Sequence, residues 1–262
     1  MGNFFNYFLH FRKSVIRKNL ILAFPGLKQV EYNKLIKSCY RHYGLVLIDF
    51  LRMPSLNIHN INDIIHIDDK SLNILKKNNG GILLTAHIGN WEYILPGLGL
   101  KNFKIAAVTK NQKNKQSNVF FTRIRKSVNA KIISHRAGSK PMINIMHEGY
   151  YLGLASDQNA GKKGVQSIFF NRSVSVPKGA AIFYLKTKYP IIIGFCILKN
   201  DFTYKISFKK LNLDGLPSDS ADAIKDINQR YTNELEKIVT KYPHQYFWFH
   251  KKWPKKLYNE PN

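Results

Sequence analysis

Cysteine, acidic residues and long apolar runs are all scarce in this chain. Its 262 residues include two cysteines, Cys39 and Cys196, both in apolar surroundings. Two cysteines cannot form a disulfide framework and show no zinc-ligand spacing, so we expect both in the core of a protein from a reducing compartment. No run of about eighteen apolar residues occurs, so we expect no transmembrane helix. Aromatic residues precede the first basic ones, which is not typical of a secretory signal.

The acids are outnumbered, because 16 Asp and Glu stand against 41 Lys and Arg, which gives a formal net charge of +25. A charge this large predicts anionic partners, such as nucleic acid, anionic lipid or an acidic carrier protein. Abundant Lys, Asn and Ile leave genome composition as a second explanation for part of the excess. The apolar content of 44% is that of a packed globule, and the length suits one large domain.

The first segment, residues 3–23, predicts an amphipathic helix. Its apolar residues at helical spacing are Phe4, Phe8, Phe11 and Val15. Its basic residues are Arg12, Lys13, Arg17 and Lys18. Aromatic and basic side chains on one short helix suit an anionic membrane surface. The alternative is a helix that packs on the protein's own core and exposes its basic face to water.

From residue 60 onward, short apolar runs alternate with helical patterns. The expected strands are 63–67, 81–86, 103–109, 131–134, 150–155, 190–197 and 203–208. The expected helices are 30–51, 71–78, 90–99, 116–128, 139–147, 177–187 and a long final helix capped by Ser218 or Asp219. This alternation predicts an α/β domain with a mixed, mostly parallel sheet flanked by helices. The short link before 203–208 predicts an antiparallel final pair.

A candidate catalytic pair follows the strand 81–86. His87 lies at its carboxyl end, the usual ligand side of an α/β sheet, and Glu92 comes five residues later. A carboxylate bonded to one ring nitrogen fixes the tautomer and supports the imidazolium that forms when the other nitrogen takes a proton. Gly89 allows a tight turn, and Asn90 is expected to cap a helix whose first N–H groups could bind an anion. On spacing alone, a helix cap with Glu92 in its favoured N-terminal position explains the pair better.

A second group of polar residues follows the strand 150–155. Asp157 and Gln158 end this strand, at the same sheet edge as His87, and a loop with Lys162 and Lys163 comes next. The lysines could bind phosphates, or they could form an ordinary solvated loop tip. Asp157 could serve catalysis, or it could simply bond a loop N–H group.

Arg125 lies near the margin of the apolar stripe on the helix 116–128. A half-buried arginine usually pairs with a carboxylate, and Asp157 and Glu92 are the candidate partners. Such an arginine could also hold a phosphate or stabilise an oxyanion. The closing segment 243–253 mixes aromatic and basic residues, which could stack nucleobases or sit at a membrane interface. We expect its Trp and Phe side chains to pack on the sheet instead.

Five blocks occur in order over residues 17–252. They are Arg17-Lys18-Asn19-Leu20 with Phe24-Pro25, residues 84–92, Asp157-Gln158-Asn159 through Phe169-Phe170, Pro177-Lys178-Gly179, and residues 243–253. Together they resemble the bacterial lipid A secondary acyltransferases, the Kdo-dependent lauroyl/myristoyl branch of the lysophospholipid acyltransferase superfamily. Five ordered blocks are far more specific than the spacing of His87 and Glu92, and they favour the catalytic interpretation of that pair.

The resemblance implies a lysophospholipid acyltransferase-like domain over residues 25–262. It would transfer a fatty acyl chain from an acyl carrier protein thioester to a hydroxyl of a lipid A precursor or related glycolipid. His87 would be the general base and Glu92 its orienting partner. Arg125 falls where the family keeps an arginine, and Asp157 would be a further active-site carboxylate. No cofactor, metal or acyl-enzyme is implied, because the acyl thioester is a co-substrate.

The resemblance also implies partners and a location. Acyl carrier protein, an anionic glycolipid and an anionic membrane surface are the expected partners, at the cytoplasmic face of the bacterial inner membrane. Family members usually carry a transmembrane helix before the first block. Here residues 1–24 are expected to act as a peripheral, membrane-associating helix.

Three departures from the family pattern leave the acceptor open. Residues 109–113 lack the usual Tyr-Arg-Pro, Asn129 replaces a common glycine, and His244 replaces an acid. A lysophospholipid, an aminolipid or a pigment precursor are alternative acceptors. A specific nucleic-acid-binding protein is the least favoured alternative, because no zinc spacing, helix-turn-helix or RNP-like motif occurs.

Overall fold

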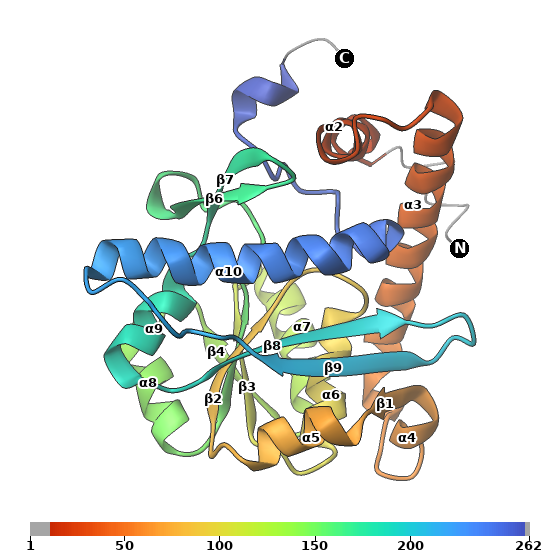
Figure 1. Cartoon of the computed structure of the whole chain (residues 1–262). Helices are drawn as coiled ribbons and strands as arrows, with labels where there is room; N and C mark the ends of the chain where they lie inside the picture. Colours follow the sequence, from red (N-terminus) through yellow and green to blue (C-terminus); the bar gives the residue numbers. More distant parts are fainter. Residues whose placement is uncertain (1–10, 260–262) are drawn as a thin grey trace.

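A computed structural model gives the structure and describes residues 11–259 (Figure 1). Its main sheet has the strands β1 (Ile65–Ile67), β2 (Gly81–Thr85), β3 (Ile105–Thr109), β4 (Ala130–Ser134), β5 (Tyr151–Ala155), β8 (Ile191–Leu198) and β9 (Tyr204–Lys210). Their order across the sheet is β1-β9-β8-β2-β5-β3-β4. Only the pair β8 and β9 is antiparallel among these strands. The mostly parallel sheet and the antiparallel final pair are both confirmed.

Helices cover both faces of this sheet and produce three layers (Figure 1). They are α3 (Gln29–Arg52), α4 (Ile61–Ile64), α5 (Asp69–Lys76), α6 (Ile94–Gly99), α7 (Lys115–Lys126), α8 (Ser139–His147), α9 (Gly179–Thr187) and α10 (Ser220–Lys241). Ile82 and Leu84 of β2 pack with residues of α8, α9 and α10, whereas Leu83 packs with residues of α5, α6 and α7. Side chains alternate between the faces of a strand, so β2 contributes to two cores.

The expected strands and helices are present, with ends displaced by a few residues. The side chain of Asp219 accepts bonds from two N–H groups in the first turn of α10, which selects it over Ser218 as the cap. The expected helix 90–99 begins differently, because a 3-10 turn, η3 (Trp91–Tyr93), precedes α6. Both cysteines are buried and free, as expected of core residues.

The N-terminal helix is shorter in the described residues than its periodicity predicts. Phe4 and Phe8 lie outside them, Phe11 is 53% exposed, and α2 (Lys13–Ala23) begins only after Arg12, which has a left-handed φ of 56°. Ile16 and Leu20, rather than the expected stripe, enter the core. The described part of the helix therefore packs on the protein itself. The membrane-associating unit 1–24 stays a prediction.

A short hairpin, formed by β6 (Val165–Phe169) and β7 (Arg172–Val176), was not predicted from the sequence. Its two-residue turn puts Phe170 and Asn171 in the left-handed region, at φ 48° and 55°. Asparagine is typical of such a turn, but an aromatic residue beside it hides the pattern. Gln229 of α10 bonds both backbone groups of Ile168, so a helix side chain pairs with the hairpin edge.

The closing segment 243–253 lies beside α2 at the top of the molecule (Figure 1). The buried amide of Asn19 donates to the carbonyls of Trp248 and His250, at 2.7 and 2.8 Å. Trp248 and Trp253 are fully buried, which confirms that these rings pack inside. Because a buried carbonyl without a partner costs roughly 1–3 kcal/mol, Asn19 stabilises the path of this segment.

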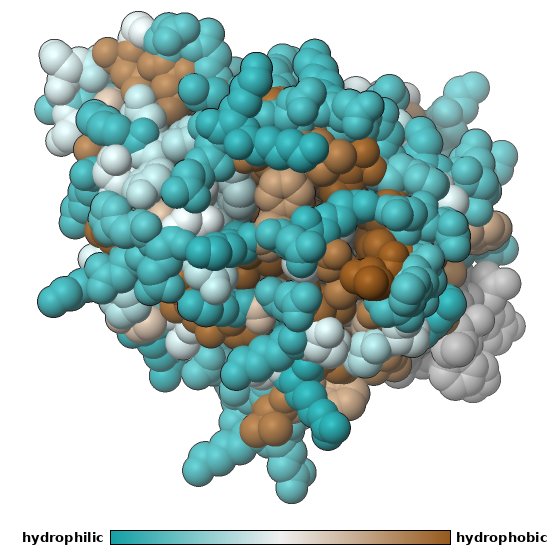
Figure 2. All heavy atoms as spheres, turned by 90° about the horizontal axis from the view of Figure 1, so that it is seen from below, coloured by the Kyte–Doolittle hydropathy of each residue, from teal (hydrophilic) through white to brown (hydrophobic). Residues whose placement is uncertain are grey.

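Seen from below, the surface is largely hydrophilic, with smaller hydrophobic patches among the polar side chains (Figure 2). Most Lys and Arg side chains of residues 11–259 are exposed. Within residues 11–259, no helix is both long and apolar enough to span a bilayer.

Candidate active site

His87 follows β2 by two residues, at the carboxyl edge of the sheet, as predicted. Its backbone carbonyl accepts from Phe247 N–H at 2.8 Å, and Gly89 N–H donates to Gln245 at 3.0 Å. Gly89 has a φ of 59°, and a Cβ there would lie 1.8 Å from the carbonyl oxygen of Cys196. Only glycine fits this position. The turn is therefore clamped between β8 and the closing segment.

The imidazole of His87 is hydrogen-bonded to Asp157. Its Nδ1 lies 2.7 Å from Asp157 Oδ1, and the Asp157 carboxylate is buried. The contact arises because β2 and β5 are parallel neighbours with Thr85 opposite Ala155, so each chain reaches the same edge two residues later. With Nδ1–H donating to the carboxylate, Nε2 is the nitrogen that remains to accept a proton.

Electrostatics favour a charge-separated pair here. Burial alone would lower the pKa of His87, but the Asp157 charge and hydrogen bond outweigh it and raise the pKa above its ordinary value. Burial would raise the pKa of Asp157, yet His87 and Lys252 lower it to about 2. Asp157 therefore stays ionised and supports an imidazolium.

Two aromatic rings flank the imidazole. The centroids of Trp91 and Phe247 lie 4.9 and 6.1 Å from that of His87. The His87 side chain nevertheless remains 22% exposed. It is therefore shielded from bulk water but open to a ligand.

Glu92 makes no hydrogen bond or ion pair with His87, and the prediction that it orients the imidazole is wrong. Its two carboxylate oxygens accept from Arg125 Nε and Nη2, at 2.9 and 2.7 Å. This bidentate geometry is the strongest available to a carboxylate and a guanidinium, so Glu92 turns towards α7. The Arg125 guanidinium also lies over the ring of Phe50, at 5.3 Å. Of the two partners considered for Arg125, the structure selects Glu92.

A cavity of about 880 Å³ opens beside both pairs, and His87, Glu92 and Arg125 line it. Its floor is apolar, with residues from the sheet face under α6. In one row across this face, Leu83 stands opposite Gly153 and Gly153 opposite Ala107. Gly153 has no side chain and Ala107 a small one, which leaves open space between the sheet and Ile94 and Leu95 of α6.

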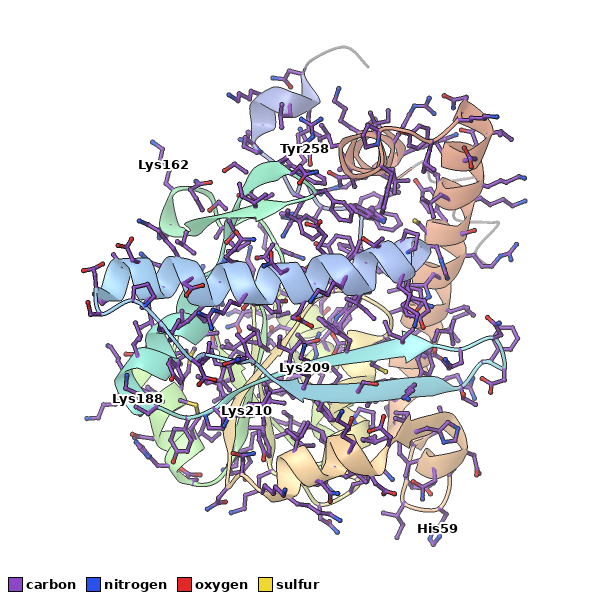
Figure 3. The ribbon with its side chains drawn as sticks, viewed as in Figure 1. His59, Lys162, Lys188, Lys209, Lys210 and Tyr258 are labelled. Atoms are coloured by element: carbon purple, nitrogen blue, oxygen red, sulfur yellow. The ribbon has the colours of Figure 1, made fainter. Side chains whose placement is uncertain are left out.

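The other predicted site residues divide into two groups. Gln158 and Lys163 line the cavity. Asn90 is fully buried, does not line it, and makes no side-chain cap to η3, which corrects its predicted place at a ligand-binding helix start. The 3-10 turn replaces that helix start. Lys162 is exposed at a loop tip and points outward (Figure 3).

Two residues near the site were missed in sequence analysis. Lys252 is buried, and its ammonium donates to the backbone carbonyl of Asp157. His42 of α3 has its Nε2 3.1 Å from the carbonyl oxygen of Gly89 and supports the turn that carries His87. Burial lowers the pKa of His42 to about 4, so it donates to this carbonyl as a neutral ring. Within the described residues, no group of three or more His, Cys, Asp or Glu is arranged to hold a metal.

An imidazole bonded to a buried carboxylate, beside a cavity with an apolar floor, is an arrangement typical of the class of enzymes that take a proton from a substrate hydroxyl group. More specifically, the chain belongs to the bacterial lipid A biosynthesis acyltransferase family, whose model matches residues 1–255. It is an acyltransferase.

Two curated relatives are similar to this chain over most of its length. One is the lipid A biosynthesis palmitoleoyltransferase of Escherichia coli (strain K12), and the other is the lipid A biosynthesis acyltransferase of Shigella flexneri. Each is 24% identical over 250 residues, which cover 94% of this chain and 79% of the relative.

The His87–Asp157 contact predicts the effect of Asp157→Asn on His87. Without the carboxylate, burial dominates, so the pKa of His87 should fall by about one unit or more. Nitrogen-15 NMR titration of the imidazole, assigned with His87→Gln, measures this shift. Asp214→Asn, an exposed carboxylate elsewhere, should leave the titration unchanged. An unchanged His87 pKa in Asp157→Asn would contradict the electrostatic coupling.

Proposed function

We propose that this acyltransferase moves a fatty acyl chain from an acyl thioester to a hydroxyl of a lipid A precursor or related glycolipid, with His87 as general base. The observation that carries the proposal is the His87–Asp157 pair at the wall of a cavity with an apolar floor. The family and the names of the two relatives supply the acceptor class.

The proposed reaction is a direct transfer. The acceptor oxygen attacks the thioester carbonyl carbon while its proton passes to His87 Nε2, and Asp157 stabilises the imidazolium. The tetrahedral intermediate then collapses, and its C–S bond breaks. The departing thiolate takes the proton back from the imidazolium, which leaves an ester, a free thiol and neutral His87.

Arg125 is the proposed donor to the oxyanion. Its Nε and Nη2 hold Glu92, so Nη1 is the guanidinium nitrogen left to face a substrate oxygen. A guanidinium fixed by a bidentate pair and by the Phe50 ring is pre-organised, which favours a role in stabilising developing negative charge. In this proposal, Glu92 positions Arg125 rather than His87.

The apolar floor is the proposed site of the acyl chain. The row Leu83, Gly153 and Ala107, covered by Ile94 and Leu95, offers hydrocarbon surface without a polar partner to desolvate. A buried chain gains roughly 0.8 kcal/mol for each methylene removed from water. The thioester carbonyl would then lie at the polar end, beside His87.

We define the basic rim as six exposed cations that line the cavity or lie next in sequence to residues that line it: Lys110, Lys113, Arg136, Lys162, Lys163 and Lys178. These residues come from the segments that follow β3, β4 and β5 and from the start of α9. Between Glu92 and Asp201 the chain contains two acids, Glu148 and Asp157. Asp157 is buried, and Glu148 precedes β5 at the opposite sheet edge. No residue of the rim is in an ion pair with a described acid.

The basic rim supports anionic substrates on both sides of the reaction. An acidic acyl carrier protein and a phosphorylated glycolipid would each be attracted by exposed lysines. We propose that the enzyme works at the cytoplasmic face of the inner membrane, held there peripherally. Each basic residue near an anionic leaflet adds roughly 1 kcal/mol to such attachment.

The function predicts loss of transfer in His87→Ala. Removal of a general base typically costs about 10²–10⁴-fold in rate, with the fold retained. The assay follows radiolabelled acyl transfer from acyl carrier protein to a lipid A precursor, with coenzyme A thioesters and lysophospholipid or aminolipid acceptors in parallel. His66→Ala, an exposed histidine distant in sequence from the site, is the control. Full activity in His87→Ala would refute the base assignment, and transfer only to another acceptor would refute the lipid A assignment.

The apolar floor predicts a change of chain preference in Gly153→Val. A Cβ at residue 153 would meet its nearest neighbour at an ordinary 3.5 Å, so the strand can accept it, but the added methyl groups occupy the floor. Activity with long acyl donors should fall about tenfold relative to donors several carbons shorter. Competition between donors of different length measures the ratio. Gly26→Val, exposed and without neighbours within 4 Å, should not change it. An unaltered preference in Gly153→Val would place the acyl chain elsewhere.

The basic rim predicts a donor-binding defect in the double variant Lys162→Ser, Lys163→Ser. Because the charges act mainly on encounter, KM for acyl carrier protein thioester should rise several-fold at low salt, with little change in kcat. The difference should shrink as salt is added. Lys76→Ser, Lys77→Ser, an exposed pair at the end of α5, is the matched control. Equal changes in KM in the two double variants would show that the net charge of the protein, and not the position of the basic rim, determines donor binding.

A further inference from the structure

The closing segment places Lys252 next to Asp157 of the His87–Asp157 pair. Among the described residues, Lys252 is the only buried Lys or Arg and Asp157 the only buried acid, with 3% and 2% of their surfaces exposed. The Lys252 ammonium donates to the backbone carbonyl of Asp157, and it lies 4.8 Å from the centre of the Phe169 ring. It is not in ion-pair contact with the carboxylate. Lys252 is not among the residues that line the cavity beside His87.

A buried ammonium is costly, and packing alone does not require one. A charge removed from water needs compensation by an opposite charge or strong hydrogen bonds. Here the compensating charge is that of Asp157, whose carboxylate also bonds His87. Burial lowers the pKa of Lys252 and Asp157 counteracts this in part, which leaves the pKa at about 8. The ammonium is therefore charged near neutral pH and contributes to the field at the imidazole.

Ionisable groups from several elements lie around the His87–Asp157 pair. Asp157, Glu92 and Lys252 act on His87, and His250 of the closing segment also faces it. Tyr231 of α10 and Tyr246 of the closing segment are close to Asp157, and burial raises both phenol pKa values, so these groups stay neutral. Glu92 is already paired with Arg125. Lys252 acts on both His87 and Asp157, and no described carboxylate is in ion-pair contact with it.

We propose that Lys252 is a positioning residue that balances part of the charge of Asp157, and so limits how strongly that carboxylate raises the proton affinity of the His87 imidazole. With Asp157 alone, the negative charge would favour a protonated ring, which cannot act as a base. With Lys252 beside it, Asp157 still fixes the tautomer of His87 through Nδ1. The positive charge of Lys252 offsets part of the stabilisation that Asp157 gives to the protonated ring. The role of His87 as a general base rests on the proposed function.

The test compares His87 in Lys252→Met, Lys252→Arg and the unaltered protein. Loss of the positive charge should shift the His87 titration, read by nitrogen-15 NMR, upward by about one pH unit. The acidic limb of the kcat/KM profile should move by the same amount, so activity lost at pH 6.5 should return at higher pH. Lys252→Arg should restore both values, and Lys251→Met, its exposed neighbour, should alter neither.

A purely structural lysine would give a different pattern. In that case Lys252→Met would lower the melting temperature and reduce kcat equally at every pH, with the His87 titration unmoved, and the proposal would be overturned. If Lys252→Met does not fold, Lys252→Gln makes the same comparison, because its amide is a donor without charge. The NMR arm needs no substrate. Absence of transfer in the unaltered protein would therefore refute the proposed function, whereas an unmoved titration would refute the role of Lys252.

Discussion

The contact between His87 Nδ1 and Asp157 Oδ1 depends on the parallel pairing of β2 with β5. Thr85 stands opposite Ala155, and the two side chains follow at equal distance along their strands. A slip of one residue would turn one of the two side chains to the other face of the sheet. Gly89, tight against β8, and the clamp from the closing segment then fix the turn that carries the imidazole. Long-range pairing, not local spacing, creates the candidate base.

The same register produces the space that a substrate would occupy. Two residues deeper in the sheet, Leu83, Gly153 and Ala107 lie side by side on the face that α6 covers. Because the smallest residue stands between the other two, the cavity extends inward from the imidazole. Polar chemistry at the edge and an apolar floor behind it are thus two consequences of one strand pairing.

Sequence reasoning found the elements but not all the partners. Strand ends place His87 and Asp157 at one edge, and this followed from alternation alone. The choice of Glu92 as partner failed because spacing along the chain cannot weigh Arg125, 33 residues away, against a nearby ring. Lys252 was one cation among 41 Lys and Arg, and its burial is a property of tertiary structure. The hairpin turn was hidden because Phe170 adopts a conformation that aromatic residues rarely favour.

The few acids of this chain include two at the candidate site, and both interact with basic groups. The two carboxylates at the candidate site are each matched, Glu92 by Arg125 in direct contact and Asp157 by His87 and Lys252. The unmatched cations of the basic rim are exposed, where water and salt screen them. A strongly positive surface and a nearly neutral interior therefore coexist. In the proposed function, the first would draw anionic substrates towards the cavity, and the second would leave the imidazole able to gain and lose a proton.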